Sequence, residues 1–123
     1  MKAFFPVTIY HNPKCGTSRN ALEMVCAAGI EPKVVEYLQT GWEIEQLKII
    51  LKDSGLKARD LLRTKGDLAG ELGLLDANVP DGAILEAMVA HPVLVERPIV
   101  VTPKGTKLCR PADVVVSLLE MPS

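Results

Sequence analysis

One cysteine lies among residues that favour thiol chemistry. The segment reads His11-Asn12-Pro13-Lys14-Cys15-Gly16-Thr17-Ser18-Arg19. Cys15 falls between a short β-rich run and a stretch with helical spacing of apolar residues. Free backbone N–H groups and the helix dipole at such a helix start stabilise an anion. We therefore expect a lowered pKa for the Cys15 thiol and a reactive thiolate, against the alternative of a small buried cysteine beside a helix cap.

Four neighbours are expected to support this thiolate: His11, Asn12, Gly16 and Ser18. His11 and Lys14 would lower the thiol pKa further if they lay close to the sulfur. Gly16 would let the backbone turn tightly against a ligand. The Ser18 hydroxyl would hydrogen-bond the sulfur anion or cap the helix.

The spacing around Cys15 limits how the thiol is regenerated. Ser18 stands where a Cys-x-x-Cys pair would have its second thiol, so a two-cysteine cycle within this segment is not expected. Either another cysteine or an outside thiol must resolve Cys15. Arg19, four residues after Cys15, is also two residues too close for a Cys-x5-Arg phosphate loop. We expect structural roles for Cys26, in the core or at its boundary, and for Cys109.

Three arginines stand in distinctive settings: Arg63 in Leu61-Leu62-Arg63, Arg97 before Pro98, and Arg110 before Pro111. The planar guanidinium donates two aligned hydrogen bonds, which suits a tetrahedral oxyanion. Arg97 and Arg110 lie at the edges of predicted strands, where they could converge on Cys15. Each arginine alone would more often be a surface ion-pair partner, but the combination favours anion binding.

The elements that must position these side chains follow from the apolar patterns. Residues 7–10 and 33–38 predict strands, and a helix from about Thr17 to Ala28 connects them, which predicts a parallel βαβ unit. Helices are expected at 44–54, 59–63, 68–72 and 83–89. Strands at 98–101 and 106–109, joined by a turn at 102–105, precede a helix after Pro111. The fold class is thus α/β: one domain, 1–123, with a thioredoxin-like βαβ–ββα core at about 5–40 and 96–120 and a helical insert at about 41–95.

Composition narrows the function classes. The chain has 123 residues, 48% of them hydrophobic, with 14 basic and 15 acidic side chains. This balance argues against binding nucleic acid or an anionic membrane through bulk charge. We find no signal peptide and no apolar run of about 18 residues, and the odd cysteine count forms no disulfide framework. A reducing cytoplasm is the expected location.

The segments above together resemble one family, the glutaredoxin-linked arsenate reductases of the ArsC type. The resemblance spans Val7 to Leu119 and includes His11-Asn12-Pro13-x-Cys15-Gly16-Thr17-Ser18-Arg19-Asn20, Leu61-Leu62-Arg63, Arg97-Pro98-Ile99-Val100-Val101-Thr102-Pro103 and Leu108-Cys109-Arg110-Pro111. It implies a thioredoxin-like fold with a helical insert and a cis proline at Arg97-Pro98.

The same resemblance implies site roles. Cys15 is the implied nucleophile, Arg63, Arg97 and Arg110 the implied arsenate ligands, and His11 and Ser18 the implied supports of the thiolate. Glutathione is the implied co-substrate and glutaredoxin the implied protein partner, with no bound cofactor and no metal expected. Two alternatives stay open: a thiol-redox enzyme acting on glutathione mixed disulfides, and a non-enzymatic regulator of the Spx type.

Overall fold

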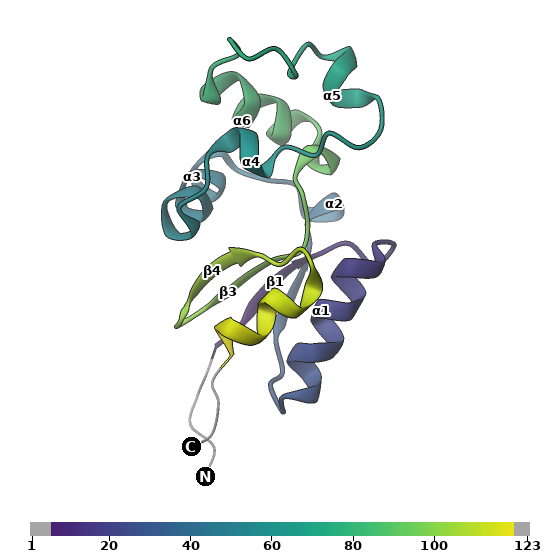
Figure 1. Cartoon of the computed structure of the whole chain (residues 1–123), viewed down its shortest axis with the longest axis vertical. Helices are drawn as coiled ribbons and strands as arrows, with labels where there is room; N and C mark the ends of the chain where they lie inside the picture. The colour runs from purple at the N-terminus through teal and green to yellow at the C-terminus, as the bar shows by residue number, and fades with distance from the viewer. Residues whose placement is uncertain (1–5, 120–123) are drawn as a thin grey trace. The chain divides into compact units, whose positions relative to one another are not determined.

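A computed structural model of the chain describes residues 6–119, and these form two compact units (Figure 1). The first unit contains residues 6–37 and 97–119, and the second contains residues 38–96. The chain therefore leaves the first unit after Tyr37 and re-enters it at Arg97. That the two units form a single domain stays a prediction.

The first unit is built on a four-stranded sheet with the order β2-β1-β3-β4. The strands are β1 (Thr8–His11), β2 (Lys33–Glu36), β3 (Ile99–Thr102) and β4 (Gly105–Leu108). β1 and β2 run parallel and are connected by α1 (Gly16–Ala27), whereas β1–β3 and β3–β4 are antiparallel. The predicted βαβ unit, the hairpin and the thioredoxin-like α/β class are thus confirmed.

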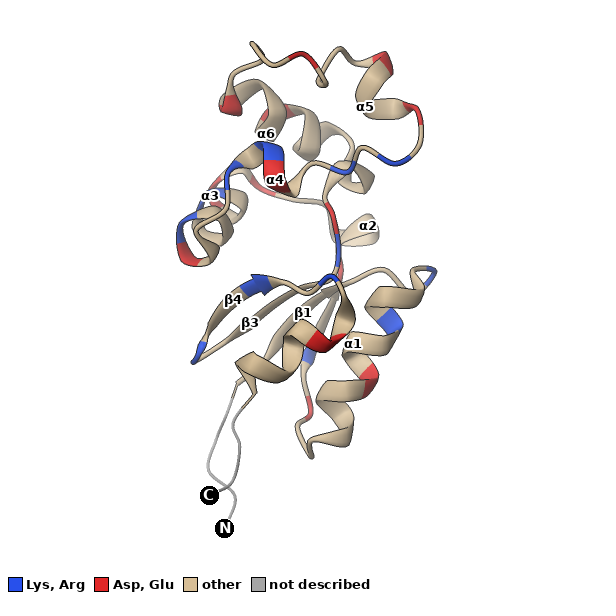
Figure 2. Ribbon diagram, viewed as in Figure 1, with Lys and Arg blue, Asp and Glu red and all other residues tan. Residues whose placement is uncertain are grey.

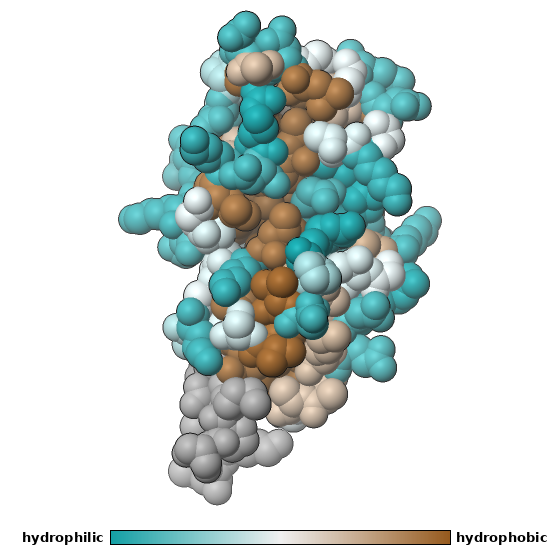
Figure 3. All heavy atoms as spheres, in the orientation of Figure 1, coloured by the Kyte–Doolittle hydropathy of each residue, from teal (hydrophilic) through white to brown (hydrophobic). Residues whose placement is uncertain are grey.

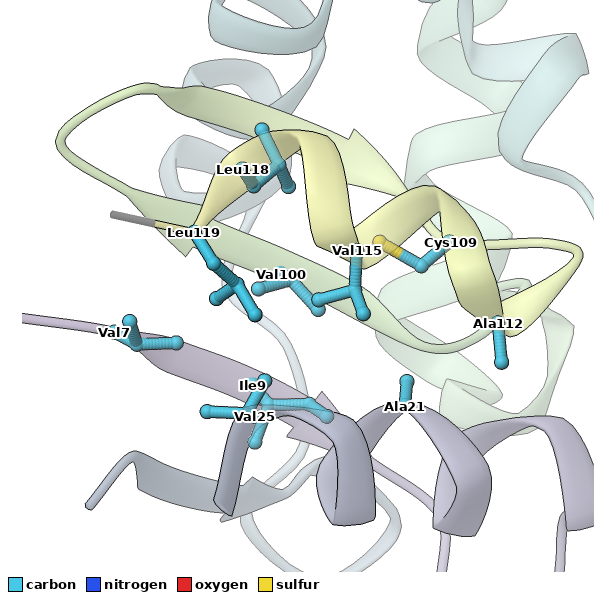
Figure 4. Close-up of a cluster of buried hydrophobic side chains, with 10 residues drawn as sticks. All are labelled: Val7, Ile9, Ala21, Val25, Val100, Cys109, Ala112, Val115, Leu118 and Leu119. Atoms are coloured by element: carbon cyan, nitrogen blue, oxygen red, sulfur yellow. The ribbon is translucent and has the colours of Figure 1, made fainter. Parts of the chain in front are cut away.

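Two helices bury one face of this sheet. Helix α1 presents Ser18, Ala21 and Val25 inward, at spacings that place them on one helix face. It packs beside the C-terminal 3₁₀ helix η2 (Ala112–Leu118). Figure 4 shows the resulting apolar core. Its buried residues are Val7, Ile9, Ala21, Val25, Val100, Cys109, Ala112, Val115, Leu118 and Leu119.

Two elements of the first unit differ from the prediction. The second strand ends at Glu36 rather than Leu38, because the chain turns into α2 (Tyr37–Thr40) and buries the Tyr37 side chain. The last helix is 3₁₀ rather than α. It contains three successive valines, 114–116, and β-branched side chains disfavour α-helix through their restricted χ1.

The second unit is helical, with α3 (Ile44–Ser54), α4 (Ala58–Leu61), α5 (Leu68–Glu71), α6 (Asp81–Ala90) and the 3₁₀ turn η1 (Pro92–Leu94). Helix α3 begins where the Glu43 N–H donates to Gln46 Oε1. It ends at Gly55, whose φ of +74° is a left-handed conformation that favours glycine. The predicted end of this helix is therefore confirmed.

Helix α4 is shorter than predicted, and this decides where Arg63 lies. It ends at Leu61, because Leu62 leaves the helix to form an antiparallel bridge with Val95. On either side of the bridge, the Arg63 N–H donates to Leu94 O and the Glu96 N–H donates to Leu61 O. Arg63 thus lies beyond the end of the helix, next to the bridge, and not on the predicted helix over 59–63.

Charges of both signs are spread over both units. In Figure 2, α1, α3 and α4 each carry basic and acidic residues. Hydrophobic atoms also reach the surface on the face in Figure 3. Ile49, Leu75 and Val116 are large apolar side chains with about half of their surface exposed. Among residues 6–119, every helix is too short or too polar to cross a membrane.

The sheet makes a matched stability prediction, because Ile9 pairs in register with Val100 on one side and Val34 on the other. Val100 is fully buried, whereas Val34 on the edge strand is 42% exposed. We expect Val100→Ala to lower the free energy of unfolding by about 2–3 kcal/mol, from lost methyl burial and the cavity it leaves. Val34→Ala should cost less than about 1 kcal/mol. Urea denaturation of both variants measures this, and equal losses would contradict the difference in burial between the two valines.

Candidate active site

The loop after β1 is shaped by its own hydrogen bonds. Asn12 is buried, its Oδ1 accepts the Lys14 N–H at 3.0 Å, and its backbone oxygen accepts the Cys15 N–H at 3.0 Å. Arg19 Nη1 donates to Pro13 O at 2.8 Å, a contact that the sequence analysis did not anticipate. These bonds fold the loop back so that Cys15 becomes the residue that precedes the first turn of α1.

His11 and Ser18 meet because each lies on a buried face. Side chains alternate along a strand, so His11 points to the same side of β1 as the core residue Ile9. Ser18 lies on the buried face of α1. His11 Nδ1 and Ser18 Oγ lie 2.6 Å apart, and Ser18 Oγ also accepts the Asn12 N–H at 3.1 Å.

The His11 ring is neutral near pH 7. Burial is the main cause that lowers its pKa below 6.5, the nearby Arg19 lowers it further, and Glu36 partly opposes them. A neutral ring supplies no positive charge, so the predicted support of the thiolate by His11 would have to act in another way. Its contact is with the Ser18 hydroxyl, so any influence of His11 on Cys15 passes through the position of Ser18.

The Cys15 pKa is lowered from its ordinary value of 9.0 by the balance of opposed effects. Burial is the largest and raises the pKa, because it disfavours the charged thiolate. Hydrogen bonding from the Ser18 N–H, from Arg97 and from Arg110, together with the Arg97 charge, outweighs it. Ser18 thus acts on the sulfur through its N–H, while its hydroxyl is committed to His11 and Asn12 rather than to the sulfur or a helix cap.

Two of the predicted arginines lie at this thiol. Arg110 Nη1 is 3.8 Å from Cys15 Sγ and donates to the backbone oxygen of Arg97 at 2.8 Å. Arg97 is only 7% exposed, and within residues 6–119 its Nε and Nη1 atoms have no hydrogen-bond partner. Both arginines precede cis prolines. The cis peptide at Arg97-Pro98 was predicted, whereas the one at Arg110-Pro111 was not.

Arg63 belongs to the second unit. Its Nη1 forms an ion pair at 2.9 Å with Glu96, a residue that the sequence analysis did not select. Nothing in the spacing of Arg63 and Glu96 reveals this pair, because they are 33 positions apart in the chain. The sequence offered one indication of a role for Glu96, namely its position immediately before Arg97.

The remaining candidates have simpler surroundings. Gly16 is exposed, has no positive φ, and a Cβ there would meet only Arg19 Nη2, at an ordinary 3.8 Å. Neither backbone conformation nor packing among the described residues therefore requires a glycine at this position. In residues 6–119, no group of three or more His, Cys, Asp and Glu side chains could hold a metal ion.

The other two cysteines differ in burial. Cys26 is exposed on the last turn of α1, so its expected place in the core or at its boundary is wrong. It follows the inward-facing Val25 by one residue, which rotates it away from the core. Cys109 is fully buried, and burial raises its pKa to about 12. A thiol with this pKa is overwhelmingly protonated at neutral pH.

The comparisons with known proteins agree with this geometry. The sequence model of the ArsC family matches residues 10–118. Arsenate reductase ArsI2 of Synechocystis sp. is 52% identical over 114 residues, covering 93% of this chain and 81% of the relative. The arsenate reductase of Escherichia coli is 50% identical over 113 residues, covering 92% and 80%.

Among solved structures, an arsenate reductase from Vibrio cholerae superposes with a TM-score of 0.89 at 41% identity, covering 94% of this chain and 98% of that one. Fold and site therefore define a thioredoxin-like protein with an activated cysteine. The chain belongs to the ArsC family.

The opposed effects on Cys15 predict how its reactivity depends on pH. In a Cys26→Ser background, where Cys15 is the accessible thiol, we expect iodoacetamide alkylation to rise with a midpoint below pH 9.0. Arg110→Met removes a donor that favours the thiolate, so the midpoint should move up. Lys107→Met is the matched control, because this exposed amine bonds Ser117 Oγ, and it should leave the midpoint unchanged. If Arg110→Met left the alkylation midpoint unchanged, Arg110 would not contribute to the lowered pKa of Cys15.

Proposed function

We propose that this protein reduces arsenate to arsenite, with Cys15 as the nucleophile. The observation that carries the proposal is the buried Arg97 guanidinium, which helps lower the Cys15 pKa while its Nε and Nη1 atoms have no hydrogen-bond partner within residues 6–119. Buried donors without partners are costly, and a bound oxyanion would satisfy them. The arsenate reductases at 50–52% identity support arsenate as that oxyanion.

The proposed first step is thiolate attack on arsenic(V). A Cys15–arsenic bond forms, and one arsenate oxygen leaves as water after taking up protons. Arg97 and Arg110 offset the negative charge on the remaining oxygens. A glutathione thiol then attacks the Cys15 sulfur, the sulfur–arsenic bond breaks, and its electron pair leaves with arsenic. Arsenate and two thiols thereby become arsenite, one water and a Cys15–glutathione disulfide.

The positions of the cysteines support an external thiol. Cys26 lies 11 residues beyond Cys15 along α1, about 16 Å at the rise of a helix, and a disulfide needs Cα atoms within about 7 Å. Cys109 is buried and protonated. We therefore propose glutathione as co-substrate and glutaredoxin as the protein that reduces the mixed disulfide. This chemistry suits the reducing cytoplasm, where we propose the protein acts.

Further roles are proposed for the other predicted residues. Arg63 is proposed as a third arsenate ligand. Asn12 is proposed to hold the loop, and His11 to hold Ser18 so that its N–H meets the sulfur. Gly16 is proposed to leave room for the arsenate oxygens or for the incoming thiol.

The activity itself is the central prediction. Purified protein with glutathione, glutaredoxin, glutathione reductase and NADPH should oxidise NADPH only when arsenate is added. Cys15→Ser should abolish this turnover, because the nucleophile is lost, while Cys26→Ser should retain it. Turnover of a glutathione mixed disulfide without arsenate dependence would instead favour the thiol-redox alternative. Capture of RNA polymerase by an inactive protein would favour the regulator.

The arginine fork makes a separate prediction. Arg97→Lys keeps the charge but loses the paired N–H groups, so we expect the KM for arsenate to rise about tenfold or more. Arg59→Lys is the matched control, since the Arg59 guanidinium binds the carbonyls of Leu74, Asp76 and Val79. That control should lower thermal stability and leave KM unchanged. An unaltered KM in Arg97→Lys would exclude Arg97 from arsenate binding.

A further inference from the structure

The Arg63–Glu96 ion pair is built into the second unit by the backbone. The bridge between Leu62 and Val95, with its flanking hydrogen bonds, places residues 61–63 antiparallel to residues 94–96. Arg63 Nη1 then meets Glu96 Oε1 at 2.9 Å. The side chains of Arg63 and Glu96 are 17% and 20% exposed, so the pair is sheltered without being sealed from water.

The pair uses one nitrogen of a guanidinium that has five N–H groups. A guanidinium presents two aligned N–H groups along the edge formed by Nε and Nη2, the edge suited to two oxygens of an oxyanion. Because Glu96 contacts Nη1, its contact does not use the edge formed by Nε and Nη2. It also restricts a long side chain that would otherwise sample many rotamers.

We propose that Glu96 is a positioning residue that orients Arg63 for arsenate. This inference rests on the proposed role of Arg63 as an arsenate ligand. Glu96 immediately precedes Arg97 in the chain, so one short segment supplies both the buried arginine beside Cys15 and the carboxylate that holds Arg63. Glu96 touches no reacting atom in this proposal, and its effect passes through the guanidinium.

A structural role alone makes a different prediction from a positioning role. The segments at 61–63 and 94–96 are already joined by backbone hydrogen bonds, which survive removal of the carboxylate. The side chains of the pair are largely buried, so removal of the carboxylate also leaves the Arg63 charge without this partner and should lower the stability. A structural role alone would change only the unfolding transition, whereas a positioning role should also weaken arsenate binding at a temperature where the variant is folded.

The test is the steady-state assay with saturating glutathione and glutaredoxin. We expect Glu96→Ala to raise the KM for arsenate about three- to tenfold with kcat within about twofold, because binding loses its preset geometry. Glu96→Gln should restore most of the wild-type KM, since its amide oxygen can still accept from Nη1. In an Arg63→Ala background, Glu96→Ala should have no further effect.

Glu45→Ala is the matched control, because it removes another acidic partner of a basic residue, Lys48, in the same unit. It should leave KM unchanged. An unchanged or lower KM in Glu96→Ala, or a Glu96→Ala effect that persists without Arg63, would overturn the inference. If Arg63→Ala raises KM and Glu96→Ala does not, the proposed function stands and only the role of Glu96 fails. If wild-type turnover is absent, the proposed function fails, and calorimetric titration with arsenate applies the same comparison to binding.

Discussion

The site depends on stabilising a sulfur anion in a partly buried place. Burial alone would raise the pKa of Cys15 and keep its thiol protonated, because a low-polarity environment disfavours the charged thiolate. The Ser18 N–H and the guanidinium groups of Arg97 and Arg110 reverse that outcome. Each of these donors must lie within hydrogen-bond reach of one atom, so the loop, the first turn of α1 and the ends of β3 and β4 are all constrained by it. A small shift of any of them would favour the neutral thiol.

The first unit meets this constraint with ordinary periodicities. Alternation along β1 points His11 to the same side as Ile9, and helical spacing puts Ser18 on the same face of α1 as Ala21 and Val25. The apolar contacts that form the core therefore also bring His11 to Ser18. Burial lowers the pKa of His11, so the role proposed for this ring is to hold, through its 2.6 Å contact with Ser18 Oγ, the serine whose N–H lies at the sulfur. The packing of the core thus also sets the position of the groups around the thiol.

The arginines show how a chain with nearly balanced charge can favour a small anion. Arg110 bridges the Cys15 sulfur and the Arg97 backbone. Arg97 is buried, and two of its donor atoms have no partner in the described part of the chain. A polyanion is bound by charge spread over a surface, whereas a tetrahedral oxyanion needs a few fixed donors. A net charge of −1 therefore argues against the first kind of ligand and says nothing against the second.

By itself, the sequence determined the strands, the crossover helix, the hairpin and the place of Cys15 before a helix, because apolar spacing, Pro and Gly act locally. Tertiary structure decided the rest. Leu62 lies outside the predicted helix because it forms a bridge with Val95, 33 positions along the chain. Hydrogen bonds on either side of that bridge satisfy the backbone groups of residues 61 and 63. The neutrality of His11, the exposure of Cys26 and the pairing of Arg63 with Glu96 likewise depend on which distant groups surround each side chain. Burial and ion pairing depend on which residues are neighbours in three dimensions, and the spacing of residue types along the chain does not predict those neighbours.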